Sequence, residues 1–257
     1  MKRCYLVLFV LLLTIGGFAQ SKPLIMYGIT DYQLTCLSPN GKWACGAFSN
    51  GASAMFAFRW NLMTNEINLL SEGNDETTAF KVSDNGVVVG TFPSKEVSVN
   101  KAPIATAGYW KDGKWHLLET LGDGIIDHPD YGGMAYCISR NGEYIGGALY
   151  SKDHKFTPVV WKDGKVYKNC DNGFEGSVLT VSNDGKVAGG WCYTKISAGT
   201  RVPVLWQDGK EPLYLCPEED GNFWRSAKAL SPDEKLVLYD QNIYNLETGE
   251  KSEVPSL

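Results

Sequence analysis

Hydrophobic residues recur along the chain in short runs that are broken by turn-forming residues. Runs such as Val87–Gly90 and Pro158–Trp161 are rich in β-branched and aromatic residues, which favour β-strands. Asp-Gly pairs stand between such runs, as in Asp112-Gly113, and predict tight hairpin turns. The pattern therefore predicts an all-β protein.

One motif occurs five times and sets the period of the chain. It consists of an apolar residue, a serine, any residue, Asn or Asp, and then Gly, with Glu234 in place of Gly in the last copy. Successive serines lie 45, 56, 43 and 49 residues apart, which is the length of one four-stranded propeller blade. Because the serines recur as a set, we expect their hydroxyls to satisfy turn backbone rather than to act as nucleophiles. The five serines are Ser38, Ser83, Ser139, Ser182 and Ser231.

An aromatic residue ends the third predicted strand of every copy. Four are tryptophans, at positions 60, 110, 161 and 206, and Tyr244 takes the place in the last copy. A large aromatic at one repeated position is a packing residue, so we expect the tryptophans in equivalent, mostly buried places. The predicted fold is a single all-β propeller, a closed ring of five four-stranded blades. The repeats span approximately residues 33–70, 78–120, 134–170, 177–215 and 226–257.

The repeated residues resemble a known group of proteins. The pattern A-x-x-I/V-S-x-D/N-G followed by A-x-x-W-x-D-G is similar to the extracellular HAF-type repeats, and Phe56–Trp60 comes closest to that signature. The turns at Ser38–Lys42 and Ser231–Asp233 resemble those of TolB-like propellers, and the whole pattern is similar to WD-repeat propellers. The resemblance implies the architecture and no particular activity, since propellers host many functions.

The N-terminus carries the features of a secretory signal. Met1–Arg3 is positively charged, Cys4–Ile15 is almost entirely apolar, and Gly17–Ala19 supplies small residues for cleavage before Gln20. A membrane anchor is the alternative, but the apolar run is shorter than the roughly 20 residues that a spanning helix needs. We expect residues 1–19 to be removed, residues 20–257 to form the propeller without a membrane span, and the protein to be secreted or periplasmic.

The charge of the chain bears on its partners. Without residues 1–19, it has 22 basic and 29 acidic residues, a net charge of −7, and no dense basic run. Nucleic acids and anionic membranes bind clusters of Lys and Arg, so neither is an expected partner.

The length of the loops points to one rim of the predicted ring. The turns after the first and third strands are always tight, whereas the other two connections vary in length and lie on the opposite rim. Insertions confined to one face mark the binding face. We therefore expect this loop-rich rim to bind a protein or a glycan. The candidate binding residues are Asp127, His128, Tyr131, Tyr150, Trp191, Tyr193, Trp224 and Arg225.

The same rim carries the one candidate metal site. Asp123, Asp127 and Asp130 lie in the longest connection between blades, and clustered carboxylates suit Ca²⁺. The alternative is a solvated acidic loop, and the spacing is not that of an EF-hand. We expect no cofactor, and Ca²⁺ is the only alternative that the residues suggest.

Known catalytic motifs are missing from the sequence. It contains no G-x-S-x-G, no H-E-x-x-H, no P-loop and no dinucleotide fingerprint. The leading interpretation is a non-catalytic binding or scaffolding module. The alternative is a glycan-active enzyme, a glycosidase or lyase, built on a five-bladed propeller and using a pair of carboxylates.

Six cysteines follow the predicted signal, and the register of the first turn decides whether Cys36 and Cys45 meet. A two-residue loop, Asn40-Gly41, makes them face each other. A three-residue loop that starts at Pro39 makes Cys36 face Ala44 and puts Cys45 on the other face of the blade. Because Pro39 suits the second position of a type I turn, we expect the three-residue loop and no Cys36–Cys45 bond.

Overall fold

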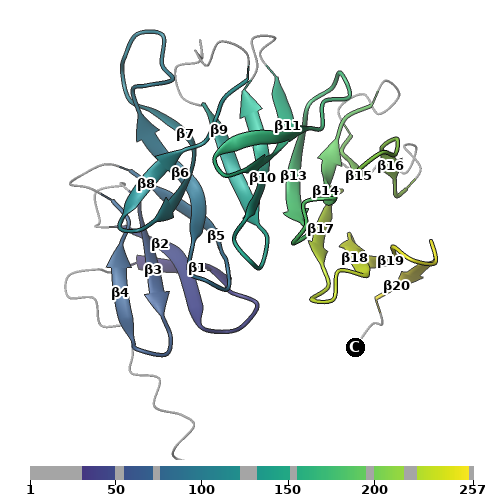
Figure 1. The fold of residues 1–257 in the computed structure, drawn as a ribbon, viewed down its shortest axis with the longest axis horizontal. Helices are drawn as coiled ribbons and strands as arrows, with labels where there is room; N and C mark the ends of the chain where they lie inside the picture. Colours follow the sequence, from purple (N-terminus) through teal and green to yellow (C-terminus); the bar gives the residue numbers. More distant parts are fainter. Residues whose placement is uncertain are drawn as a thin grey trace, which may run out of the picture.

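The computed structural model consists of five antiparallel β-sheets. It describes residues 31–49, 55–71, 76–121, 132–150, 155–194, 200–216 and 225–254. Each sheet has four strands that lie side by side in chain order, so the predicted repeat of five four-stranded units is confirmed. Figure 1 shows the sheets following one another along an arc, from the first in purple and blue to the last in yellow. We number them blades 1 to 5.

The strand bounds show how regular the repeat is. Blade 1 comprises β1 Asp31–Leu37, β2 Trp43–Ser49, β3 Met55–Asn61 and β4 Glu66–Leu69. Blade 2 comprises β5 Thr78–Val82, β6 Val88–Ser94, β7 Ile104–Lys111 and β8 Lys114–Leu117. Blade 3 comprises β9 Gly133–Ile138, β10 Tyr144–Tyr150, β11 Phe156–Lys162 and β12 Lys165–Asn169. Blade 4 comprises β13 Gly176–Val181, β14 Val187–Cys192, β15 Val202–Gln207 and β16 Leu213–Tyr214. Blade 5 comprises β17 Ala227–Leu230, β18 Leu236–Tyr239, β19 Asn242–Asn245 and β20 Lys251–Glu253.

The predicted signal peptide, residues 1–19, lies outside the described residues. Within the part of the chain that the structure describes, no helix is long and apolar enough to cross a membrane.

The repeated serine organises the turn between the first and second strands. In blade 1, the Ser38 hydroxyl donates to Oδ1 of Asn40 at 2.8 Å and accepts the backbone N–H of Trp43 at 2.9 Å. Gly41 closes this turn with a φ of +69°, a left-handed conformation that glycine adopts without strain. The serine hydroxyl accepts a backbone N–H in the same way in the other four blades. The interpretation of the serines as turn residues is therefore confirmed.

The first and second strands approach so closely that only glycine fits at one position. A Cβ atom added to Gly147 on β10 would lie 2.0 Å from the carbonyl oxygen of Met134 on β9. Gly46, Gly90 and Gly190 occupy the same place in blades 1, 2 and 4 and meet the same obstacle. Glycine therefore recurs at this position of four blades because a Cβ atom would collide with the backbone of the neighbouring strand.

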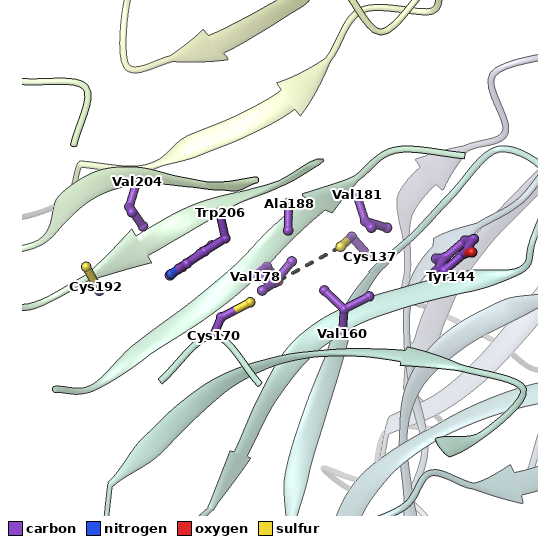
Figure 2. Packing of buried hydrophobic residues seen from close by; sticks show 10 residues of the cluster. All are labelled: Cys137, Tyr144, Val160, Cys170, Val178, Val181, Ala188, Cys192, Val204 and Trp206. Atoms are coloured by element: carbon purple, nitrogen blue, oxygen red, sulfur yellow. Dashed lines mark hydrogen bonds between the residues drawn. The ribbon is translucent and has the colours of Figure 1, made fainter. Parts of the chain in front are cut away.

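Neighbouring blades pack through the repeated aromatic residue. Trp161 is fully buried with Val89 of the preceding blade, and its indole N–H donates to the carbonyl oxygen of Glu119 at 2.8 Å. Figure 2 shows the equivalent cluster between blades 3 and 4, where Trp206 and Val178 pack with Cys137. Trp110, Trp161 and Trp206 are at most 8% exposed. For these three, the expected equivalent, buried positions are confirmed.

The junction between blades 5 and 1 differs from the other four. Within the described residues, no strand of blade 5 packs against blade 1 to the extent seen between consecutive blades. Leu34 of β1 is 51% exposed, although Ala79 at the same repeat position is fully buried against blade 1. Leu238 of β18 is likewise 37% exposed. Trp60 is partly exposed and packs against Phe48, Phe56 and Phe58 of its own blade. The predicted closure of the ring is therefore not found among the described residues, and Trp60 is less buried than its three counterparts.

The register of the first hairpin also differs from the prediction. Cys36 faces Cys45 and Leu37 faces Ala44, with an irregularity between Leu34 and Cys36. The Ser38 N–H donates to the Trp43 carbonyl at 2.8 Å, so the loop contains four residues rather than three. The one additional residue in the turn moves the register by one position, so that Cys36 and Cys45 face each other. Both are free thiols in the structure.

Candidate functional site

A cavity lies where the first strands of all five blades end. Its volume is about 180 Å³, and its walls come from the ends of β1, β5, β9, β13 and β17 and from the serine turns that follow three of them. We call this cavity the central channel. It opens at the rim of tight turns, opposite the loop-rich rim.

The wall of the central channel is rich in positive charge. Lys81 on β5, Arg140 in the turn after β9 and Lys228 on β17 all line it. Arg140 pairs with Asp84 at 3.2 Å and donates to the carbonyl oxygen of Pro232 at 3.2 Å, so it spans from blade 3 to blades 2 and 5. Lys81 and Lys228 are exposed and form no ion pair with the described residues. Two lysines that form no ion pair with the described residues therefore line one small space.

The only carboxylate among the described residues that line the channel is Glu234. Its Oε1 accepts the backbone N–H of Asn183 at 2.7 Å, which engages it in holding blade 4 to blade 5. The lining is thus cationic on balance, although the whole chain carries a net charge of −5.

Hydrogen bonds between successive turns hold this rim together. Asn40 donates its backbone N–H to Oδ1 of Asp84 at 2.7 Å and its amide to the Asp84 carbonyl at 2.9 Å. Asn141 makes the same two bonds to Asn183, each at 3.0 Å. At the two ends of the arc, the residue after the serine is proline, Pro39 and Pro232. Proline has no side-chain acceptor, so this bonding pattern cannot continue from blade 5 to blade 1.

Two thiols also line the channel, and their environments differ. The pKa of Cys36 is lowered to about 6, mainly by a hydrogen bond from Cys45, and the charge of Lys81 acts in the same direction. Cys137 occupies the same repeat position in blade 3, where burial raises the pKa of its thiol to about 12. The pKa values of the two thiols of the channel wall are therefore shifted in opposite directions from that of a free cysteine.

A second hollow lies between blades 2 and 3 on the same rim. It has a volume of about 290 Å³, and its lining includes Tyr109, Glu143 and Asp163. The ring of Tyr109 stacks on His116 with centroids 4.8 Å apart. Burial, followed by the nearby Asp163 charge, raises the pKa of Tyr109. We call this hollow the blade 2–3 groove; it combines an aromatic ring with two carboxylates.

Four of the predicted binding residues are described, and all lie toward the loop-rich rim. Tyr150 ends β10, Trp191 and Tyr193 lie at the end of β14, and Arg225 precedes β17. Trp191 is only 9% exposed, with the Arg201 guanidinium 3.9 Å from its ring centroid and Tyr193 packed beside it. Trp191 therefore contributes mainly to local packing.

Arg225 contacts blade 5 and the end of blade 4. Its Nε lies 3.5 Å from Oδ2 of Asp240, and its NH1 donates to the Cys216 sulfur at 3.0 Å. Tyr150 packs edge-on against Phe156, with ring centroids 5.4 Å apart. Both residues of the rim are thus oriented by neighbours from their own blade and from the preceding blade.

The remaining predicted residues lie outside the described part of the chain. They are Asp127, His128, Tyr131 and Trp224 of the binding rim, and Asp123 and Asp130 of the candidate Ca²⁺ site. Among the residues that are described, no group of three or more His, Cys, Asp or Glu side chains is placed to hold a metal ion. The Ca²⁺ site stays a prediction.

The central channel and its lysines were not predicted from the sequence. One signal was available: Lys81 stands at the repeat position that Cys36, Cys137, Thr180 and Ala229 occupy in the other blades. A long cation at a position otherwise filled by small residues breaks the repeat, and such an exception indicates a role outside packing.

No family model and no curated protein matches the sequence. Among solved structures, a putative TolB from Agrobacterium tumefaciens aligns with a TM-score of 0.53 at 12% identity, over 88% of this chain and 81% of that one. The uncomplexed acylaminoacyl peptidase of Pyrococcus horikoshii aligns with a TM-score of 0.51 at 13% identity, over 88% of this chain and 39% of that one. The chain is a β-propeller.

The similarity shows the fold of the propeller and nothing finer. TolB from Acinetobacter baumannii aligns with a TM-score of 0.42 at 11% identity over 70% of this chain, and the propeller spans 41% of its length. The alignment with the Agrobacterium tumefaciens protein confirms the expected likeness to TolB-like propellers at the level of the fold. The likeness to HAF-type repeats has no matching family and stays a resemblance of motifs.

Proposed function

We propose that this propeller is an exported, non-catalytic binding module that takes an acidic segment of a partner protein into its central channel. The observation that carries the proposal is the pair of unneutralised lysines, Lys81 and Lys228, that face the same cavity from blades 2 and 5. Carboxylates are the groups that ammonium and guanidinium donors bind best.

The geometry of the channel suits a side chain or a chain end rather than a folded surface. A cavity of about 180 Å³ admits a few carboxylate-bearing groups, and its partly apolar wall lowers the effective dielectric constant around them. The hydrogen bonds between turns keep the cationic groups in place before the ligand arrives, which reduces the entropic cost of binding. The loop-rich rim remains the predicted contact surface for a protein or a glycan.

Reversing the two lysine charges should abolish this binding. We expect the K81E/K228E variant to bind a fluorescein-labelled hexaglutamate peptide about tenfold or more weakly than the natural protein, measured by fluorescence anisotropy at low salt. K114E/K210E is a matched control, because it makes the same change of charge outside the channel lining. Equal weakening by both variants would show that net charge, rather than the channel, governs binding.

The alternative function, a glycan-active enzyme, is favoured by one observation. The blade 2–3 groove is lined by Tyr109 and by the two carboxylates Glu143 and Asp163. Glycosidases use a pair of carboxylates to cleave the glycosidic bond. If this groove is catalytic, the release of reducing ends from a polysaccharide should fall by about a hundredfold or more in both E143Q and D163N. Activity that survives both substitutions, or no activity in the natural protein, would exclude this function for the groove.

A further inference from the structure

Blade 1 contains a pair of cysteines that no other blade repeats. Cys36 on β1 directly faces Cys45 on β2. The equivalent pairs are Lys81 with Val89, Cys137 with Gly146, and Ala229 with Leu238. Directly facing residues of antiparallel strands have Cβ atoms about 4.5–5.5 Å apart, close to the separation that a disulfide requires. The pair is thus a local departure from the repeat that places two thiols within bonding reach.

The two thiols differ in access. Cys36 is half-buried and is one of the residues that line the central channel. Cys45 is fully buried behind it, between blades 1 and 2. Its sulfur lies 3.5 Å from the hydroxyl of Thr35, and that hydroxyl donates to the Ala79 carbonyl of blade 2 at 2.8 Å. One cysteine therefore lies at the cavity, and the other is fully buried.

The charges around Cys36 favour its thiolate. Cys45 donates a hydrogen bond to it from β2, and Lys81 faces it from β5. Across the cavity lie Arg140, Lys228 and Glu234. The hydrogen bond from Cys45 and, to a smaller extent, the charge of Lys81 lower the pKa of Cys36 to about 6 against the effect of burial, while the same hydrogen bond and burial raise the pKa of Cys45. A thiolate in front of a protonated thiol is the arrangement of a reactive dithiol.

We propose that Cys36 and Cys45 form a thiol–disulfide exchange site in the channel wall, whose co-reactant is a small disulfide. The Cys36 thiolate attacks one sulfur of R–S–S–R, forms a mixed disulfide and releases R–S⁻. Cys45 then loses its proton to solvent, and its thiolate attacks the Cys36 sulfur. This second step forms the Cys36–Cys45 bond and releases another R–S⁻. The two cysteines are oxidised by two electrons, and the small disulfide is reduced to two thiols.

The test uses dithiodipyridine, an aromatic disulfide whose released thione absorbs light, on the reduced, purified protein. Trypsin cleaves after Lys42 and so separates the two cysteines into different peptides. We expect a non-reduced digest of the natural protein to contain these two peptides joined by a disulfide. The C45A variant should instead keep the reagent on Cys36 as a mixed disulfide. C137A is the matched control, since it removes the channel thiol without a facing partner, and it should leave the linked peptides unchanged.

The rate of alkylation by iodoacetamide, followed at each cysteine by mass spectrometry, tests the chemistry without any variant. Because the thiolate is the nucleophile, the rate at Cys36 should rise with pH and reach half its maximum near pH 6. At pH 6.5, C45A should react at Cys36 about fivefold more slowly, after allowance for the lower nucleophilicity of a more acidic thiol. A midpoint near about 8.5, the value of a free cysteine, or a digest without the linked peptides, would overturn the proposal.

Discussion

Replacing Trp161 by alanine should lower the free energy of unfolding by about 3–5 kcal/mol. The side chain is fully buried between blades 2 and 3, and its indole N–H is bonded to the Glu119 carbonyl. The substitution therefore leaves a large cavity and also an unpaired buried carbonyl oxygen. Urea denaturation followed by circular dichroism measures the loss.

Trp60 provides the matched control for this prediction. It occupies the same repeat position but is partly exposed, on a face of blade 1 against which no other blade packs closely within the described residues. W60A should therefore cost about half as much or less, because part of the side chain already contacts water. A loss below about 1 kcal/mol for W161A, or equal losses for the two variants, would contradict the assignment of the tryptophans to the blade junctions.

The second large effect is expected at a glycine. G147A should lower the free energy of unfolding by about 3 kcal/mol or more, because the new Cβ would lie 2.0 Å from the Met134 carbonyl oxygen, an atom of the backbone that cannot move without separating β9 from β10. The same denaturation measurement reports the change, and hydrogen exchange should show faster opening of these two strands.

Gly209 separates this steric effect from the general cost of replacing glycine. It has a φ of +69°, and an added Cβ would find nothing within 4 Å. G209A should thus cost only about 1–2 kcal/mol, the penalty of a left-handed backbone for a residue with a Cβ. A smaller loss for G147A than for G209A would show that the close approach of the strands is not required.

The architecture could be predicted because four of the five copies share the same residue types at the first turn, in the second strand and at the end of the third strand. The Ser-x-Asn/Asp-Gly turn, the glycine of the second strand and the aromatic end of the third strand each have a local physical reason. A fold can be predicted from a sequence when its turns, its strands and its packing positions all favour the same structure. One copy alone would have predicted hairpins, whereas the period predicted the blade.

The rest depended on tertiary context. The register at Cys36 depends on an irregularity in β1 and on a four-residue loop. A difference of one residue in the length of a turn does not change the hydrophobic pattern of the sequence. The open junction could not be predicted from Trp60, which looks like its three counterparts in sequence. The convergence of Lys81 and Lys228 depends on the arrangement of blades around the axis, since nearly 150 residues separate them.

The uncovered junction between blades 5 and 1 makes the propeller resemble a split ring rather than a closed one. In a closed ring, the diameter of the channel is fixed, because widening it would break a packed interface. A split ring opens or tightens by small rotations shared among its four packed junctions, and every strand ladder stays intact. Widening the central channel would therefore cost less packing energy in these five blades than in a closed ring of the same size.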